Sequence, residues 1–370
     1  MTAETKCDIG RIAAHFQIDG RFLDAAPYGN GHIHDTFASR FDGDNGVRRY
    51  IHQRINHNIF TDPPRLMENI ARICDHMQAK LEATTGADPE REAMKIVKTK
   101  ADALLFIEDD GTYWRTYLFI EGAQSYDVIE HNNQALEAAR AFSRFQRLLD
   151  DLPGDPLIDT IPGFHHTPIR FAALEGAIEA DSCNRATGCA AEIDFALGRK
   201  PIVSRVTEGL EKGSLPIRVT HNDTKVNNVL LDDETGVGIA VIDLDTVMNG
   251  SSLYDFGDLV RTSTGHFDES EKDLGKVYID VERFASVARG YLGEALTFLT
   301  PAEMDLLVFS GQLITFENGI RFLTDHLEGD VYYKIHNPDQ NLDRTRTQFA
   351  MVRSIEANAV ELDRIIEGYR

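Results

Sequence analysis

Short hydrophobic runs bounded by turn residues dominate the first 120 residues, and this pattern is typical of β-strands. The runs begin at Arg49 and occupy residues 95–97, 103–107 and 113–120. A turn cluster rich in Asp, Asn and Gly, residues 42–46, precedes the first of them. The front part of the chain is therefore predicted to be mainly β-structure.

Helical periodicity interrupts this part once and dominates from about residue 130. Two prolines after Asp62 begin a segment whose apolar residues recur every three or four positions, as on one face of a helix. Residues 300–303 form a capping-box signal that begins another such segment. The predicted helices begin at residue 63, span 135–149, run on from residue 301 through 323, and span 342–368.

A short β island at 217–219, 229–231 and 239–242 lies within the helical part. This layout predicts an α+β fold of two lobes, with a β-rich lobe at residues 1–120 and a mainly helical lobe at 121–370. Clefts between lobes are favoured ligand sites, so we expect the chemistry at this junction.

Composition and charge narrow the possible functions. Hydrophobic residues make up 42% and charged residues 26% of the chain, which is ordinary for a globular protein. The net charge of −22 argues against binding to nucleic acid or to an anionic membrane surface. An anionic substrate such as ATP would need a metal ion to cancel its charge locally. The absence of a Cys-x-x-Cys pair, a signal peptide or a long apolar stretch favours a soluble cytoplasmic protein.

The strongest chemical signal lies in the β island. Asp223 follows one strand, and Lys225 and Asn228 come two and five residues later. Asp243 ends a hydrophobic strand twenty residues after Asp223. Phosphoryl transfer needs a carboxylate for the attacking hydroxyl, oxygen ligands for Mg²⁺ and a cation near the transferred group. Asp223 can supply the first, Asn228 and Asp243 the second and Lys225 the third; the alternative is a polar turn between two strands.

This pattern resembles the catalytic loop of protein kinases, His-x-Asp-x-Lys-x-x-Asn, with its metal-binding Asp. The stretch 253–258, Leu-Tyr-Asp-Phe-Gly-Asp, makes the chain more similar to the aminoglycoside phosphotransferase-like family of small-molecule kinases. Within that family it resembles the N-acetylhexosamine 1-kinases. The stretches that carry this likeness are 27–33, 219–225, 242–246, 321–323 and 344–348.

The resemblance implies a protein-kinase-like fold that binds ATP and Mg²⁺ and phosphorylates the anomeric hydroxyl of GlcNAc or GalNAc. The same chemistry on another small alcohol, such as homoserine, choline or an aminoglycoside, remains open. A nucleotide-binding pseudokinase that acts as a scaffold is the third possibility.

The resemblance also assigns the ATP contacts. Gly29 and Gly31 are predicted to form a turn in which the lack of side chains lets backbone N–H groups come close to a phosphate. A plain hairpin turn has the same pattern. The lysine expected on the next strand is missing, and Gln53 or Arg54 occupies its place. Residues 117–122 resemble the hinge between the lobes, which makes Phe119 and Glu121 the expected adenine contacts; a buried strand that ends in a turn is the alternative.

The acceptor is expected to contact one arginine and several smaller groups. Arg321 has Glu317 and Asp325 four residues to either side, so it is either an exposed ion-pair ladder or a donor to sugar hydroxyls oriented by two carboxylates. The remaining predicted sugar contacts are Tyr332, His32, Asp245 and Asp223 itself. Tyr332 could instead be a loop aromatic, His32 could only brace its turn, and Asp245 could orient Lys225 or cap a strand.

Overall fold

The computed structural model describes residues 8–29 and 33–370, and these residues form two compact units. The first unit contains the chain up to residue 123 together with 151–161 and 239–247. The second contains 124–150, 162–238 and 248–370. The sequence predicted a single division at residue 120. The structure differs mainly in that segments 151–161 and 239–247 also belong to the first unit, and the second of these segments carries Asp243 and Asp245.

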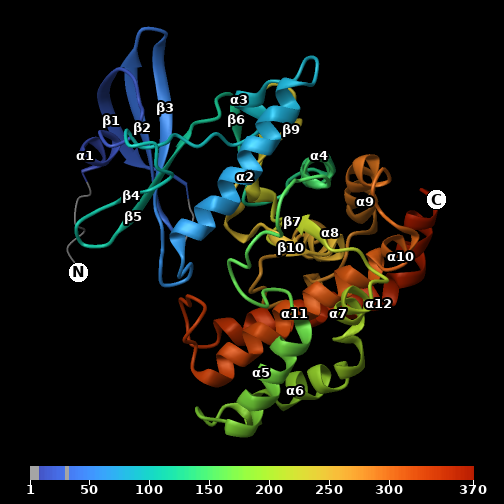
Figure 1. The fold of residues 1–370 in the computed structure, drawn as a ribbon. Helices are drawn as coiled ribbons and strands as arrows, with labels where there is room; N and C mark the ends of the chain where they lie inside the picture. Colours follow the sequence, from blue (N-terminus) through green and yellow to red (C-terminus); the bar gives the residue numbers. More distant parts are fainter. Residues whose placement is uncertain (1–7, 30–32) are drawn as a thin grey trace. The chain divides into compact units, whose positions relative to one another are not determined.

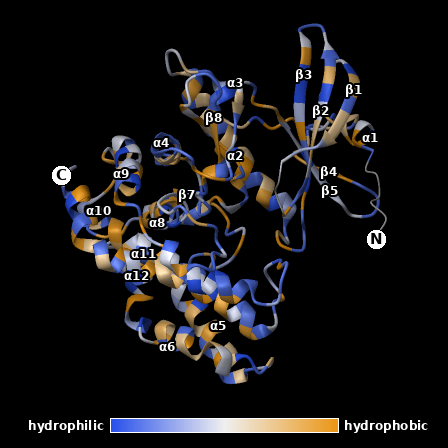
Figure 2. Cartoon of the chain, turned by 180° about the vertical axis from the view of Figure 1, so that it is seen from behind, coloured by the Kyte–Doolittle hydropathy of each residue, from blue (hydrophilic) through white to orange (hydrophobic). Residues whose placement is uncertain are grey.

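The first unit is built on one antiparallel sheet with strand order β1-β2-β3-β5-β4 (Figure 1). The turn at 42–46 is present, because β2 and β3 pair to the end at Gly43 and Gly46. Apolar and polar residues are mixed along β1, β2 and β3 (Figure 2). The strands are β1 Arg21–Pro27, β2 Asp35–Gly43, β3 Gly46–Arg54, β4 Phe106–Ile107 and β5 Tyr113–Leu118.

Two strand predictions were too generous. Residues 95–97 make one isolated bridge, between Ile96 and Tyr117, because only Lys95 and Val97 exchange backbone hydrogen bonds with β5. The run at 103–107 contributes only the two residues of β4. Both segments lie next to β5, whose pairing with β4 is equally short.

The sheet has two chemically different faces. Residues directly opposite each other in an antiparallel pair point to the same side. Trp114 therefore shares a face with His52, and helix α1 (Ile9–Ala13) packs against Trp114 on that face. Gln53 pairs with Arg115 on the opposite face, where the Arg115 side chain reaches helix α2 (Pro63–Glu82). Short helix α3 (Pro89–Glu92) follows α2.

The second unit is mainly helical. Its helices are α4 Asn132–Leu149, α5 Thr167–Ala180, α6 Ala190–Leu197, α7 Arg205–Glu211, α8 Ser252–Ser263, α9 Val281–Ala295, α10 Pro301–Met304, α11 Leu307–Glu328 and α12 Gln340–Glu367. The remaining short strands are β6 Ala123–Gln124, β7 Arg218–Thr220, β8 Val229–Asp232, β9 Gly238–Val241 and β10 Met248–Gly250, and β9 belongs almost wholly to the first unit. Among the helices of the described residues, none is both long and apolar enough to cross a bilayer.

One helix prediction needs correction. The capping box at Thr300 and Glu303 is present, but it begins the single turn of α10 and not one long helix. The backbone leaves helical geometry at Leu306 (φ −114°, ψ 3°), and α11 begins after it.

Helix α11 is the centre of the second unit and packs against α5, α8 and α12 (Figure 1). Phe316 and Ile320 from α11 lie in an apolar cluster with residues of the other helices. Gly257 lets α8 approach closely, because a Cβ at this position would lie 2.5 Å from the Ser310 carbonyl oxygen of α11. This contact fixes α8, whose two aspartates face the site described below.

His52 gives the first unit a measurable pH dependence. It is buried between Ser39 and Thr116, with ring nitrogens 2.7 and 2.9 Å from their hydroxyls. Burial lowers its pKa from 6.5 to about 4. The unfolded chain therefore binds a proton that the folded chain refuses, and the free energy of unfolding falls as pH drops below 6.5.

We expect wild type to lose about 2 kcal/mol more than His52→Gln between pH 7 and pH 5, since one pKa unit is worth about 1.4 kcal/mol. Urea unfolding followed by fluorescence of Trp114, the only tryptophan, measures this difference. Parallel losses in the two proteins would contradict the assignment.

Candidate active site

The loop after β7 is held by a single carboxylate of α8. Asp255 accepts the backbone N–H groups of His221 and Asn222 at 2.9 and 2.7 Å. The Thr224 hydroxyl donates to the Asp255 carbonyl at 2.7 Å. Asn222 adopts a left-handed backbone (φ 65°), which these bonds help to stabilise. Hydrogen bonds to Asp255 of α8 therefore fix the loop that carries Asp223 in the protein without ligand.

Asp255 itself is fully buried. Burial raises its pKa, and the donated backbone N–H groups counteract that rise. Gln146 of α4 also donates to the carboxylate, at 2.6 Å. Removing a carboxylate that satisfies two buried backbone donors would leave those donors without a partner.

A histidine holds the same loop from another side. His165 lies 2.9 Å from the Asn222 carbonyl oxygen through Nε2 and 2.8 Å from Glu317 through Nδ1. Both partners are acceptors, so both ring nitrogens donate. Burial lowers the pKa of His165, but Glu317 outweighs it and leaves the pKa raised. His165 thus links the loop to Glu317 of α11.

Asp223 lies beside a cation and an amide. The Lys225 Nζ is 2.8 Å from one carboxylate oxygen, and the Asn228 amide donates to the other at 3.2 Å. Burial alone would raise the pKa of Asp223, but the charge and hydrogen bond of Lys225 leave it lowered. Asp223 is therefore ionised at neutral pH and can accept a hydrogen bond or a proton from a hydroxyl.

The predicted Mg²⁺ ligands have suitable donor atoms. Asn228 spends its amide nitrogen on Asp223, which leaves its side-chain oxygen for another partner. Asp243 belongs to the first unit, where it follows β9 in a left-handed conformation (φ 61°) and begins a 3₁₀ turn. Amide and carboxylate oxygens are the ligands that Mg²⁺ prefers, so each of the two residues has a donor atom of the kind that this metal takes.

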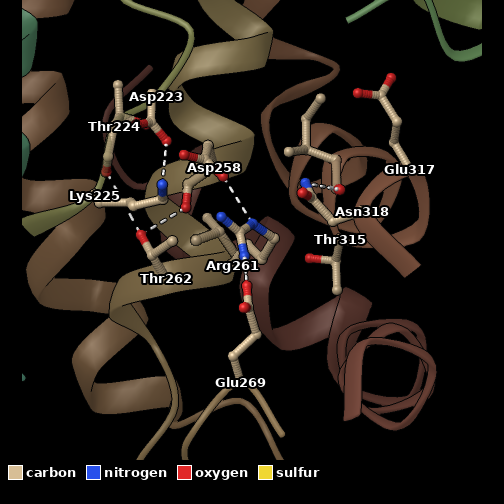
Figure 3. A network of polar contacts seen from close by, with 12 residues as sticks. Asp223, Thr224, Lys225, Asp258, Arg261, Thr262, Glu269, Thr315, Glu317 and Asn318 are labelled. Carbon is tan, nitrogen blue, oxygen red and sulfur yellow. Dashed lines mark hydrogen bonds and ion pairs between the residues drawn. The ribbon is translucent and has the colours of Figure 1, made fainter. Parts of the chain in front are cut away.

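A network of charged side chains lies beside Lys225 (Figure 3). Arg261 of α8 donates to Asp258 at 2.7 Å and approaches Glu269 at 3.4 Å. The other Asp258 oxygen is buried and has no hydrogen-bond partner among the described residues. Arg261 is nearly enclosed, and its pairing with these carboxylates, despite burial, holds its pKa above the ordinary value.

Arg321 is not an exposed ladder, and neither flanking carboxylate pairs with it in the described part of the chain. Glu317 is engaged with His165, and Asp325 accepts backbone N–H groups of the loop that follows α11. The Arg321 guanidinium instead lies over two aromatic rings, 5.2 Å from the centre of Phe164 and 5.9 Å from that of Tyr333.

Tyr332, the loop residue predicted to contact the sugar, is largely exposed. Tyr332 is 62% exposed and meets Tyr333 edge to face. Tyr333, which the sequence analysis did not single out, is the tyrosine that faces Arg321. Its signal was weak, because two adjacent tyrosines do not reveal which one points inward.

Gln53 and Arg54, the two residues that could take the place of the missing strand lysine, point to opposite faces of the sheet. Gln53 shares a face with Arg115 and accepts from its Nε at 3.0 Å. Arg54 points to the opposite side, as period-two strands require, and pairs there with exposed Asp35. A phosphate on the Gln53 face would therefore be out of reach of Arg54.

Asp245 already has partners. Both of its oxygens are engaged by Arg115, and His34 Nε2 lies 3.0 Å from one of them. The carboxylate is 2% exposed. A contact of Asp245 with a sugar or with Lys225 would require its bonds to Arg115 and His34 to break.

The predicted hinge adjoins a cavity of about 590 Å³, lined in part by Leu118, Phe119 and Glu121. Arg49 covers the Phe119 ring at 3.6 Å and donates to Glu121 at 2.9 Å. Tyr28 meets the same ring edge to face. Aromatic and charged side chains therefore lie together beside this cavity.

The glycine turn can be described only in part. Gly29 has a positive φ of 76° and open space where a side chain would be. Gly29 therefore adopts a backbone conformation that residues with a side chain rarely take. Gly31 and His32 lie outside the described residues.

Comparison with known proteins identifies the family. The sequence profile of the phosphotransferase enzyme family (APH) matches residues 24–286, more than half of the chain. The chain belongs to this phosphotransferase family. The match includes most of the sheet, the loop that carries Asp223 and α8, and it ends before α11.

Solved structures share the fold. A spectinomycin phosphotransferase, solved with ADP and spectinomycin, has a TM-score of 0.54 at 14% identity over 96% of this chain and 97% of that one. An aminoglycoside phosphotransferase from Alicyclobacillus acidocaldarius gives 0.55 at 12% identity, covering 95% of each chain. A choline/ethanolamine kinase family protein from Mesorhizobium loti gives 0.51 at 17%, covering 98% of each. The predicted kinase-like α+β fold with a β-rich front lobe and a helical body is confirmed.

The Asp255 contacts predict a specific defect. In Asp255→Asn, one oxygen becomes an amide nitrogen that faces a backbone N–H, so one buried hydrogen bond is lost at a cost of about 1–3 kcal/mol. We expect kcat to fall by roughly ten- to a hundredfold with ADP affinity nearly unchanged. Steady-state ADP release and calorimetric ADP binding measure the two effects.

Asp232→Asn is the matched control, since Asp232 also accepts backbone N–H groups, but in the exposed turn after β8. It should leave kcat unchanged. A kcat for Asp255→Asn within threefold of wild type would remove Asp255 from the positioning of the loop.

Proposed function

We propose that the protein transfers the γ-phosphoryl group of Mg·ATP to the anomeric hydroxyl of an N-acetylhexosamine, giving ADP and the sugar 1-phosphate. The observation that carries the phosphotransfer is the pre-formed set of Asp223, Lys225 and Asn228 on a loop fixed by Asp255. The choice of sugar rests on the sequence resemblance and on the charge of the acceptor side.

In this proposal Asp223 orients the C1 hydroxyl and accepts its proton as the oxygen attacks the γ-phosphorus. The lowered pKa of Asp223 keeps it ionised for this task. Lys225 disperses the negative charge that moves off the transferred group. Asn228 and Asp243 hold Mg²⁺, which supplies charge neutralisation of the phosphates.

The first unit supplies the nucleotide contacts. Phe119 and Glu121 border the cavity at the hinge and are proposed to hold adenine. Gln53 is the strand residue on the face that also carries Arg115, so we keep it, and not Arg54, as a phosphate contact. Gly29 and Gly31 are proposed to offer backbone N–H groups to the phosphates.

Charge around Arg321 supports a neutral acceptor. In the described part of the chain neither Arg321 nor Arg170 pairs with a carboxylate; Arg170 donates only to the Phe164 carbonyl. Burial, and after it the neighbouring Arg321, lower the pKa of Arg170, while Glu317 acts in the opposite direction. A cationic acceptor such as an aminoglycoside or choline would be repelled here.

The aromatic pair argues in the same direction. Quaternary ammonium ligands are recognised by aromatic faces. Here the faces of Phe164 and Tyr333 already bind the Arg321 guanidinium. The guanidinium can still offer N–H donors to sugar hydroxyls, and this chemistry suits a polyhydroxylated neutral molecule.

A panel of acceptors tests the proposal. We expect Mg²⁺-dependent ADP release with GlcNAc or GalNAc, and little with homoserine, choline or kanamycin. Asp223→Asn is the inactive control and should lower kcat by roughly 10²–10⁴-fold. ADP release that prefers a cationic acceptor would contradict the acceptor assignment, and no turnover with any acceptor would favour a pseudokinase.

Arg321→Ala should change which acceptor is preferred. Loss of a charged donor costs about 1.5–3 kcal/mol, which is roughly ten- to more than a hundredfold in kcat/KM for the sugar. The same change uncovers Phe164 and Tyr333, so the ratio of choline to GlcNAc turnover should rise. The KM for ATP should stay near its wild-type value.

Arg353→Ala is a suitable control, because Arg353 also lies over an aromatic ring, that of Phe195, but on the cluster between α6 and α12. If Arg321→Ala and this control behave alike, Arg321 has a structural role only.

A further inference from the structure

A buried ion pair in the first unit joins the sheet to the turn that carries Asp243. Arg115 of β5 and Asp245 are each 2% exposed. The two guanidinium Nη atoms each bond one carboxylate oxygen, and the Nη2 distance is 2.6 Å. Two parallel bonds fix the direction of both groups.

The neighbours of this pair leave it little freedom. Gln53 accepts from Arg115 Nε at 3.0 Å and donates to Thr36 at 3.1 Å. His34 accepts the Asn56 backbone N–H through Nδ1, so its Nε2 carries the proton and donates to Asp245 at 3.0 Å. The carboxylate is thus held by β5 and by the segment just before β2.

In protein kinases a lysine of strand β3 pairs with a glutamate of the helix that follows, and this pair is required for an active nucleotide site. Here the strand lysine is missing. The strand position carries Gln53, and the helix α2 atom near the guanidinium is the Met67 sulfur, 3.9 Å from Arg115 Nη1. The cation lies on the adjacent strand, directly opposite Gln53, and its carboxylate lies two residues after Asp243.

We propose that the Arg115–Asp245 pair replaces the strand lysine and its helix partner, and that it holds the Asp243 turn in the geometry that binds a metal–nucleotide complex. Arg115 and Asp245 are positioning residues in this account, acting through Asp243. The left-handed backbone of Asp243 (φ 61°) needs such support, because it is a strained conformation for a non-glycine residue. The inference rests on the proposed kinase function.

Binding without turnover tests the pair. The double variant Arg115→Met/Asp245→Leu removes both charges at once, which buried ion pairs tolerate far better than the loss of one partner. ADP affinity is measured by calorimetry with Mg²⁺ and with EDTA, on wild type and variants shown to be folded by circular dichroism. The matched control is Arg199→Met/Glu356→Leu, which removes another two-bonded pair in the second unit.

The measured quantity is the factor by which Mg²⁺ raises ADP affinity. We expect this factor to fall at least fivefold in the double variant, with affinity in EDTA close to wild type, and to be unchanged in the control. A smaller fall in the folded double variant overturns the proposal. Should the double variant not fold, Asp245→Asn, which keeps the shape of the side chain, is judged by the same threshold.

Failure of the proposed function gives a different result. If Mg²⁺ does not raise the ADP affinity of wild type, the metal-assisted transfer itself is wrong. If wild type responds to Mg²⁺ and the variants respond equally, only the positioning role of Arg115 and Asp245 is wrong.

Discussion

The catalytic loop depends on one buried carboxylate. Asp255 accepts two consecutive backbone N–H groups of the loop, and its own carbonyl accepts a third bond from Thr224. Buried backbone donors must be paired, so this carboxylate fixes where the loop can lie. Asp223 then has its position set by main-chain bonds and its charge set by Lys225. Close packing of α8 on α11 at Gly257 places Asp255 for this task.

Each unit contains an ion pair beside one of the proposed site residues. In the second unit Lys225 keeps Asp223 ionised, and Arg261 is neutralised by Asp258 and Glu269. In the first unit Arg115 engages Asp245 next to Asp243. Such pairs are costly to bury, so their value lies in holding geometry and charge and not in stability alone. Arg321 differs, because its guanidinium lies over two aromatic rings.

The sequence predicted what depends on local spacing. Strands and helices with clear periods were found, and the pattern from Asp223 to Asn228 with Asp243 led to the phosphotransferase family. The role of Arg115 could not be predicted, because it depends on the register that brings β3 and β5 together across some sixty residues of chain. The break between α10 and α11 gave no signal, because the apolar spacing continues through it.

Both alternatives for Arg321 relied on Glu317 and Asp325 as its partners, and the structure gives these carboxylates other partners for a related reason. Spacing of four residues predicts ion pairs on an exposed helix surface. Helix α11 is buried on most sides, and the two carboxylates are drawn to partners from distant segments: Glu317 to His165, and Asp325 to the loop backbone at 331–333. In this buried helix, contacts with distant segments take the place of ion pairs between residues four apart. Such contacts cannot be predicted from spacing along the chain.

The central claim is that this site moves a phosphoryl group to the anomeric oxygen of a neutral amino sugar. Phosphorus NMR of a reaction with Mg·ATP and GlcNAc tests it most directly, because the signal distinguishes a phosphate on C1 from one on any other hydroxyl. The account predicts ADP and a single new signal coupled to the anomeric proton. A product phosphorylated at another position, or hydrolysis of ATP with no phosphosugar, would contradict it.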